Sequence, residues 1–209
     1  MRTITPHSVA LGIALVLGIS VQAQGPAFGI KGGLNVSNLH VNDANKENSR
    51  LGFNLGVFGR TDPEGPVGLQ VELLYSTKGT HTTYNAFFGL VDQDVDFNLN
   101  YLELPVLVGF RLGPVLELQA GGYAGYLLSA KVKTSGDLGS GSDELDRDHF
   151  RSADFGVVGG VALNFGNAQI GARYNYGLTE IADSNGAKAV LGDAKNACAQ
   201  LYVAIGLGR

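Results

Sequence analysis

Residues 200–208 read QLYVAIGLG, and their side chains sort strictly by position. Alternate residues of a strand lie on opposite faces, so a period of two predicts a half-buried β-strand. One face of this segment is aliphatic, and the other is made of glycine, alanine and two residues with polar atoms. The aliphatic face is Leu201, Val203, Ile205 and Leu207, and the other is Gln200, Tyr202, Ala204, Gly206 and Gly208.

Seven segments upstream show the same alternation. Each has large apolar residues at every second position, with mainly glycine or single polar residues between them. The segments are Phe28–Val36, Leu51–Arg60, Val67–Ser76, Phe97–Leu112, Leu116–Lys131, Phe155–Phe165 and Ile170–Thr179.

The fourth of these segments breaks phase. Phe97, Leu99 and Tyr101 have one parity, whereas the apolar residues from Leu102 to Leu112 have the other. We expect a β-bulge near Tyr101–Leu102 to reset the register at this point.

The connections between the segments alternate in length. Tight connections fall at Thr61–Pro66, Gly113–Pro114 and Gly166–Asn167, and long polar ones at Asn38–Ser49, His81–Asp94, Lys133–Phe150 and Glu180–Lys195. Short turns on one side and long loops on the other are typical of transmembrane β-barrels. The sequence therefore predicts an all-β fold, an eight-stranded antiparallel up-and-down transmembrane β-barrel with short periplasmic turns and long outer loops.

The N-terminus predicts export. Arg2 is followed by the apolar run Val9–Ile19, and Val21-Gln22-Ala23 resembles a signal-peptidase site. The run is too short to span a bilayer as a helix. We therefore expect a signal peptide over residues 1–23 and an outer-membrane barrel domain over residues 24–209.

The composition of the chain argues against several classes of protein. The 209 residues carry a formal net charge of −4, and no basic stripe marks a nucleic-acid surface. The single cysteine, Cys198, excludes an internal disulfide framework. Beyond the signal peptide no apolar run is long enough for a transmembrane helix, so insertion would require a barrel. We expect a monomer without a cofactor.

Periodicity alone does not decide which face of each strand meets water. A soluble barrel turns its apolar face inward, whereas an outer-membrane barrel turns that face to lipid. The sparse charges and many glycines on the polar face suit a crowded lumen. Aromatic residues also gather near the strand ends, as in the two interfacial girdles of membrane barrels. Those at the periplasmic rim are Phe28, Phe110 and Phe165, and those toward the outer half are Tyr75, Phe97, Tyr101, Tyr126, Phe155, Tyr174 and Tyr176.

The predicted inward face contains charges of both signs. Buried charges are costly unless paired, so we expect a network inside the lumen. The proposed network is Lys31, Glu72, Glu103, Arg111, Glu117, Lys131 and Arg173, with Glu72, Glu103 and Arg173 at its centre, and Arg60, Lys78 and Asp154 are also expected to point inward. We expect this network to plug the barrel; the alternative is a narrow polar pathway.

The loops hold the residues that could carry chemistry. They are His40, His81 and His149, with Asp92, Asp94 and Asp96 in one loop and Asp143, Glu144, Asp146 and Asp148 in another. Such residues could form a hydrolytic or metal site, but no HExxH, GxSxG or calcium-loop motif is present. We favour hydrated loops, with no catalytic, cofactor-binding or metal residues. Cys198 is expected to fill space in the lumen.

Several motifs resemble the PorT-like outer-membrane β-barrel family of Bacteroidota. They are Gly29–Asn35, Glu72–Ser76 with Lys78-Gly79, Tyr101–Pro105 and Arg173–Leu178. The resemblance implies an integral outer-membrane barrel without a catalytic site, and one group in the family serves a protein-secretion system. Such barrels usually end on an aromatic residue read by the insertion machinery, whereas this chain ends in Gly206-Leu207-Gly208-Arg209.

We therefore expect a non-enzymatic outer-membrane protein with a structural, surface-binding or secretion-accessory role. Its expected partners are outer-membrane lipid, the barrel-insertion machinery and secretion-system components. Two alternatives remain open at this point. One is a barrel enzyme acting on lipid or peptide at the outer rim, and the other is a soluble exported barrel that binds a small apolar ligand.

Overall fold

The computed structural model describes residues 27–40, 48–62, 65–86, 91–136, 141–144, 151–180 and 195–208. The predicted signal peptide lies outside these residues. The strands are β1 (Ala27–His40), β2 (Asn48–Arg60), β3 (Val67–Ala86), β4 (Val91–Leu112), β5 (Leu116–Gly136), β6 (Gly141–Glu144), β7 (Ala153–Phe165), β8 (Ala168–Glu180) and β9 (Lys195–Gly208). No helix in the described part of the chain is long and apolar enough to cross a membrane.

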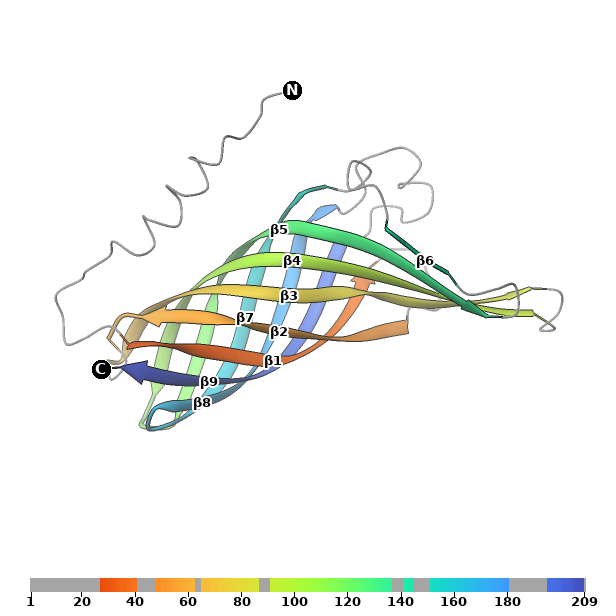
Figure 1. Cartoon of the computed structure of the whole chain (residues 1–209). Helices are drawn as coiled ribbons and strands as arrows, with labels where there is room; N and C mark the ends of the chain where they lie inside the picture. The colour runs from red at the N-terminus through yellow and green to blue at the C-terminus, as the bar shows by residue number, and fades with distance from the viewer. Residues whose placement is uncertain are drawn as a thin grey trace, which may run out of the picture.

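The sheet closes on itself. Its strand order is β4-β3-β2-β1-β9-β8-β7-β5-β6, and β4 also pairs with β5. The eight long strands therefore form a closed antiparallel barrel, and the four-residue β6 is an addition at the edge of β5 (Figure 1). The predicted eight-stranded barrel is confirmed.

The short turns lie at the end of the barrel where β1 begins and β9 ends. Phe28 at the start of β1 pairs with Gly208 at the end of β9, so the two terminal strands meet there. The turns contain three residues with positive φ, namely Asp62 at 44°, Gly113 at 78° and Gly166 at 59°. Left-handed backbone is what such tight reversals require, and glycine adopts it without steric cost. In membrane barrels of this kind this end is periplasmic.

Parts of two predicted long loops are strand, and the sequence prediction was wrong for those residues: 81–86 and 91–94 in one loop, and 133–136 and 141–144 in the other. β3 and β4 stay paired from Thr82↔Val95 to Ala86↔Val91, and β6 pairs with Lys131–Thr134 of β5. Figure 1 shows β3, β4 and β5 running past the other strands at the outer end. Polar sequence marks where a strand leaves lipid rather than where it ends, because backbone pairing continues in water. The other two predicted loops fall mostly on residues 41–47 and 181–194, outside the described part.

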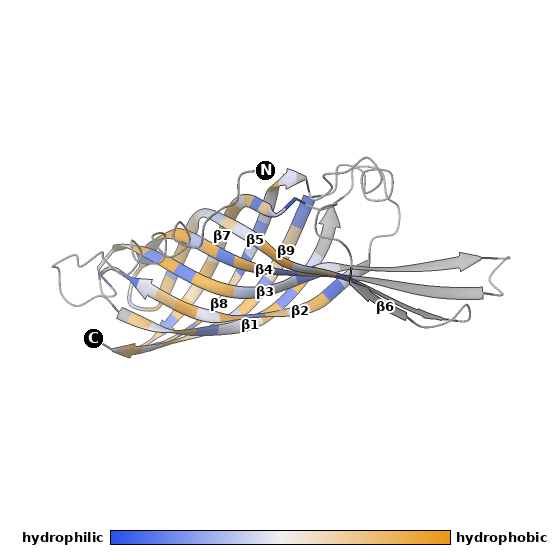
Figure 2. Ribbon diagram, turned by 45° about the horizontal axis from the view of Figure 1, so that its top comes forward, coloured by the Kyte–Doolittle hydropathy of each residue, from blue (hydrophilic) through white to orange (hydrophobic). Residues whose placement is uncertain are grey.

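The apolar parity faces outward along the barrel wall. Val203 and Ile205 are 47% and 44% exposed, whereas their neighbours Tyr202 and Ala204 are each 2% exposed. Figure 2 shows the resulting alternation of hydrophobic and hydrophilic positions along the strands. A soluble barrel with an apolar interior would need the opposite facing, so that alternative is wrong.

The predicted bulge is near the right level but belongs to the neighbouring strand. Asn100 of β4 pairs with Ser129, and Tyr101 pairs with Leu127, so Leu128 is the extra residue and lies on β5. From Asn98 to Leu112, the part of β4 whose side chains the structure describes, the alternation does not change phase. Leu99 and Tyr101, expected on the lipid side, are 2% and 1% exposed inside the barrel.

The girdle prediction holds in part. Phe28, Phe110 and Phe165 are exposed at the periplasmic rim. Toward the outer end the exposed aromatics are Tyr75, Tyr126, Phe155 and Tyr174, and Tyr176 is partly exposed. Tyr101 is the exception because it points into the lumen, and the side chain of Phe97 lies outside the described part.

The outward facing of β9 predicts the effect of a charge placed on it. Val203→Arg should destabilise the barrel in a phosphatidylcholine bilayer by about 2–4 kcal/mol, as a midplane cation does on the lipid face of such barrels. Urea titration of protein folded into vesicles measures this change. Val203→Leu is the matched control and should change stability by less than about 1.5 kcal/mol. Equal stability of the two variants would contradict the assigned facing.

Candidate functional site

The barrel interior is polar and densely filled. Its strands direct alternate positions inward, and the inward residues include charged, amide and hydroxyl side chains at 0–6% exposure. These are Lys31, Asn35, Ser37, Asn54, Gln70, Glu72, Ser76, Lys78, Glu103, Glu117, Gln119, Asp154, Gln169, Arg173, Asn175, Asn196 and Gln200. Buried polar groups are tolerated only when they are bonded, so the interior is the candidate functional site.

One carboxylate organises the periplasmic half of the lumen. Glu72 of β3 accepts from Lys31 Nζ at 2.9 Å, and from Arg173 Nη1 and Nη2 at 2.8 Å each. The guanidinium approach is bidentate, which is the strongest geometry for this pair. Gln70 Nε2 donates to the same carboxylate at 2.5 Å. We call Lys31, Glu72, Arg173 and Gln70 the Glu72 network.

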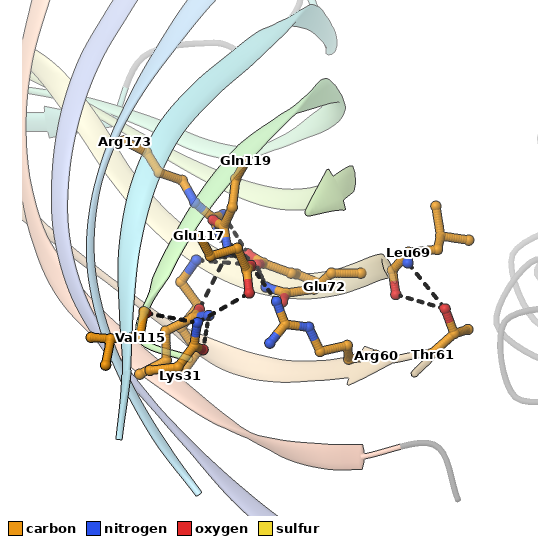
Figure 3. A network of polar contacts seen from close by, with 12 residues as sticks. Lys31, Arg60, Thr61, Leu69, Glu72, Val115, Glu117, Gln119 and Arg173 are labelled. Atoms are coloured by element: carbon orange, nitrogen blue, oxygen red, sulfur yellow. Dashed lines mark hydrogen bonds and ion pairs between the residues drawn. The ribbon is translucent and has the colours of Figure 1, made fainter. Parts of the chain in front are cut away.

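The Glu72 network continues across the barrel to β5. Arg173 Nη2 donates to Gln119 Oε1 at 2.9 Å, and Gln119 Nε2 donates to Glu117 Oε1 at 2.8 Å. Glu117 also forms an ion pair with Arg60 of β2. Figure 3 shows these side chains converging from opposite walls of the barrel. Since opposite walls are joined, the contacts close the bore at this level.

A tyrosine ring fills the space beside the two cations. Lys31 Nζ lies 3.7 Å from the centroid of the Tyr202 ring, and Arg173 Cζ lies 4.6 Å from it. The Tyr202 hydroxyl donates to Gln119 Oε1 at 2.9 Å. Gly171 is the cross-strand neighbour of Tyr202, and a Cβ there would collide with the ring. Glycine on β8 therefore makes room for the aromatic plug on β9.

A second cluster fills the outer half. Lys78 Nζ lies 2.5 Å from Glu103 Oε1 and 3.7 Å from Asp154 Oδ2. Asp154 Oδ2 also accepts from the Tyr123 hydroxyl at 3.1 Å and from Asn196 Nδ2 at 2.8 Å. We call these residues the Lys78 cluster. It links β3, β4, β5, β7 and β9, so it too spans the bore.

Apolar side chains share the interior with the ion pairs. Leu107, Tyr123 and Val158 form one buried apolar cluster. Toward the outer end Leu99, Leu127 and Ala130 are 2%, 1% and 0% exposed. An interior with little water strengthens the electrostatic attraction between opposite charges.

The structure places the residues of the predicted lumen network in separate groups. It brings Lys31, Glu72 and Arg173 into direct contact and links Glu117 to them through Gln119, as described above. Glu103 lies in the Lys78 cluster rather than beside Arg173. Arg111 is partly exposed near the periplasmic end.

Lys131 lies on the exposed face of β5 instead of inside the lumen. The reason is the extra residue Leu128, which reverses the parity of β5 beyond it, so that Ala130 takes the inward position.

Several members of the interior were missed by sequence reasoning. Gln70, Gln119 and Asn196 carry no charge, so a search for complementary charges overlooked them. Their inward parity was the available signal for Gln70 and Gln119, and the same parity had already predicted that Tyr202 points inward. What parity did not reveal is that Gln119 joins the two carboxylates by accepting from Arg173 and donating to Glu117.

The predicted chemical candidates of the loops fall outside the described side chains. These are His40, His81, His149, Asp92, Asp94, Asp96, Asp143, Glu144, Asp146 and Asp148. Within the part of the chain that the structure describes, no three His, Cys, Asp or Glu residues are grouped to hold a metal ion. Cys198 is fully buried in the lumen. The described interior consists of side chains that bond to one another or fill space.

Comparison with known proteins identifies one matching family. The family described as outer membrane protein beta-barrel domain matches residues 22–183. No curated protein matches the chain. Among solved structures, Ail, the attachment invasion locus protein of Yersinia pestis, is 19% identical with a TM-score of 0.49, covering 88% of this chain and 100% of that one. Neisserial surface protein A is 16% identical with a TM-score of 0.47, covering 87% and 99%.

The position of Glu72 between two cations predicts an asymmetric response to mutation. Glu72→Gln leaves both Lys31 and Arg173 buried without their carboxylate and should cost about 3–5 kcal/mol. Arg173→Gln should cost less, because the Lys31–Glu72 pair survives. The double variant should lose less than the sum of the two single losses. Urea titration in lipid vesicles gives the three free energies of unfolding, and strict additivity would contradict the shared network.

A second pair provides the control for this cycle. Arg173 is opposite Gly160, which lies six residues along β7 from Asp154, a rise of roughly 20 Å. Arg173→Gln and Asp154→Asn should therefore add within about 0.5 kcal/mol.

Proposed function

The chain belongs to the outer membrane protein beta-barrel domain family, and from that premise we propose that it is a plugged, non-enzymatic barrel with a structural and surface-binding role. It is an integral protein of the outer membrane, with its apolar wall in lipid. The family match and the outward apolar parity together define this location.

One observation carries the proposal of a plugged lumen. The ion pair from Glu72 on β3 to Arg173 on β8 joins strands four places apart in the eight-stranded barrel, so it crosses the bore, and Lys31 on β1 binds the same carboxylate. An eight-stranded barrel has an interior just wide enough for side chains. With the lumen filled in two layers, function would be exerted at the barrel ends and on its outer surface.

The extended strands support a role at the cell surface. β3, β4 and β5 run beyond the other barrel strands on the side opposite the short turns, which is the extracellular side of such barrels (Figure 1). A rigid barrel with projecting hairpins is a suitable platform for a binding partner.

More specifically, we propose that the protein has an accessory role in secretion. It rests on the PorT-like motifs of the sequence, such as Tyr101–Pro105. We further propose that the protein works as a monomer inserted by the barrel-insertion machinery, with secretion-system components as partners.

The plug predicts an absence of conductance. Purified protein in planar bilayers should show no steady open-channel steps, and reconstituted vesicles should take up no sugars. The triple variant Lys31→Ala, Glu72→Ala, Arg173→Ala removes the charges that cross the bore and serves as the positive control, with measurable ion conductance expected. Stable single-channel steps from the unmodified protein would overturn the proposal and make transport of small solutes the leading function.

A further inference from the structure

Gln200 of β9 is buried in the lumen with an amide group that no neighbouring side chain binds. The residue is 2% exposed, and within the described part of the chain neither its Nε2 nor its Oε1 atom has a hydrogen-bond partner. Removing an amide from water without replacing its hydrogen bonds is strongly unfavourable. A bonding group other than these side chains is therefore expected beside Gln200.

The side chains on either side of Gln200 are bonded elsewhere. Gln200 pairs with Asn35 of β1 and with Arg173 of β8. Asn35 Nδ2 donates to Ser76 Oγ at 3.0 Å, and Asn35 Oδ1 accepts from Asn54 Nδ2 at 2.6 Å. Both terminal nitrogens of Arg173 donate within the Glu72 network. The amide of Gln200 is thus left over when the neighbouring bonds are made.

Two further polar atoms without a partner belong to the adjoining strand β8. They are Arg173 Nε and Asn175 Oδ1, which are buried and bond to no residue that the structure describes. Asn175 is 2% exposed and pairs with Cys198, which lies two residues before Gln200 on the same inner face. Long side chains at such diagonal positions of neighbouring strands lie within reach of one another. The unpartnered atoms of β8 and β9 therefore gather at one level of the lumen.

This level lies between the two polar layers of the plug. On its periplasmic side Arg173 binds Glu72, and on its outer side Asn196 of β9 donates to Asp154 in the Lys78 cluster. Each layer joins strands across the bore. A small molecule held beside Gln200 would therefore be enclosed from both ends of the barrel.

The unpartnered atoms match water better than they match an ion. Arg173 Nε and Gln200 Nε2 donate hydrogen bonds, whereas Gln200 Oε1 and Asn175 Oδ1 accept them. The positive charge of Arg173 would repel a metal cation, and the two amide oxygens would repel an anion. A water molecule both donates and accepts, and a buried water typically bonds about three polar groups that are otherwise unsatisfied.

We propose that Gln200, Asn175 and Arg173 form a binding site for ordered water inside the plug. The water satisfies the amide groups that the surrounding side chains leave unbonded, and it separates the Glu72 network from the Lys78 cluster. The site goes beyond the proposed role of the barrel at the cell surface. Its test does not depend on conductance, so the two proposals can fail separately.

Water contacts of the Gln200 amide test the site in full-length protein folded into phosphatidylcholine nanodiscs. In deuterated protein with protonated amide groups, NMR cross-relaxation is measured between water and the side-chain amide protons. The spectrum of Gln200→Met assigns the Gln200 signals by their loss. We expect a signal whose sign shows that the water tumbles with the protein. Its absence from the unmodified protein would overturn the proposal.

Hydroxyl and thiol protons exchange with bulk water and could relay such a signal, so two variants remove the nearest of them. Cys198→Ala removes the thiol two residues along β9, and Ser76→Ala removes the hydroxyl that binds Asn35. A directly bound water predicts that the Gln200 signal persists in both variants. Loss of the signal in either one would show relay and contradict a bound water.

The stability of Gln200→Met distinguishes a hydrated amide from one that has no partner at all. If water bonds the amide, Gln200→Met removes those bonds, and the unfolding equilibrium constant from urea titration should rise about five- to thirty-fold. An amide without any partner predicts the opposite change, because an apolar side chain of similar size removes a desolvation cost.

Gln169→Met provides the reference for that titration. The Gln169 amide is bonded directly, since its Nε2 donates to Asn164 Oδ1 at 2.8 Å and its Oε1 accepts from the Tyr202 hydroxyl at 3.1 Å. The loss of these bonds should raise the unfolding constant by a similar factor. An unchanged or lowered constant for Gln200→Met, beside a raised one for Gln169→Met, would rule out the water site.

Discussion

Lipid offers no hydrogen-bond partner to a backbone amide, and this constraint governs the architecture of the whole chain. An open sheet would leave two edges unpaired in hydrocarbon, so the sheet closes through β4–β5 while the terminal strands β1 and β9 pair with each other. Closure with eight strands fixes a bore that side chains can fill. Every inward residue consequently faces side chains from across the barrel, and the chemistry of the interior follows from which of them meet.

Charged side chains in such a bore are stable only when they are paired, and Glu72 shows how the chain supplies the partners. Its two cationic partners come from β1 and β8, far from it in sequence, so the contacts exist only in the closed barrel. A slip of one residue in any of these strands would turn its member of the network toward lipid. The network therefore specifies the register of the barrel as well as filling it, which gives buried ion pairs a role even where their net contribution to stability is small.

The sequence was sufficient for the elements governed by a local rule. Alternation along residues 200–208 and the tight turns at Gly113 and Gly166 predicted the strands, their facing and their order. Prediction failed where the environment changes along one strand: the apolar Leu99 and Tyr101 look lipid-facing, yet they point inward toward the outer end of β4. It also failed for specific partners, because parity places Glu103 and Arg173 in the lumen but not at a common height. Lys131 was misplaced by a single extra residue, Leu128, which leaves no separate trace in the hydrophobic pattern.

Large side chains in the lumen lie beside glycines of the adjacent strands. This packing limits what can pass through the barrel. Tyr202 has glycine as its cross-strand neighbour on both sides, Gly33 on β1 and Gly171 on β8, and Tyr123 has Gly156. Each large ring thus occupies the space that a missing Cβ leaves free. To open a path, Tyr202 would have to leave its contacts with Lys31 and Arg173, which pack against its ring and bind Glu72. Packing and charge together therefore oppose solute passage. The surfaces that remain available for function are the projecting strands and the lipid-facing wall.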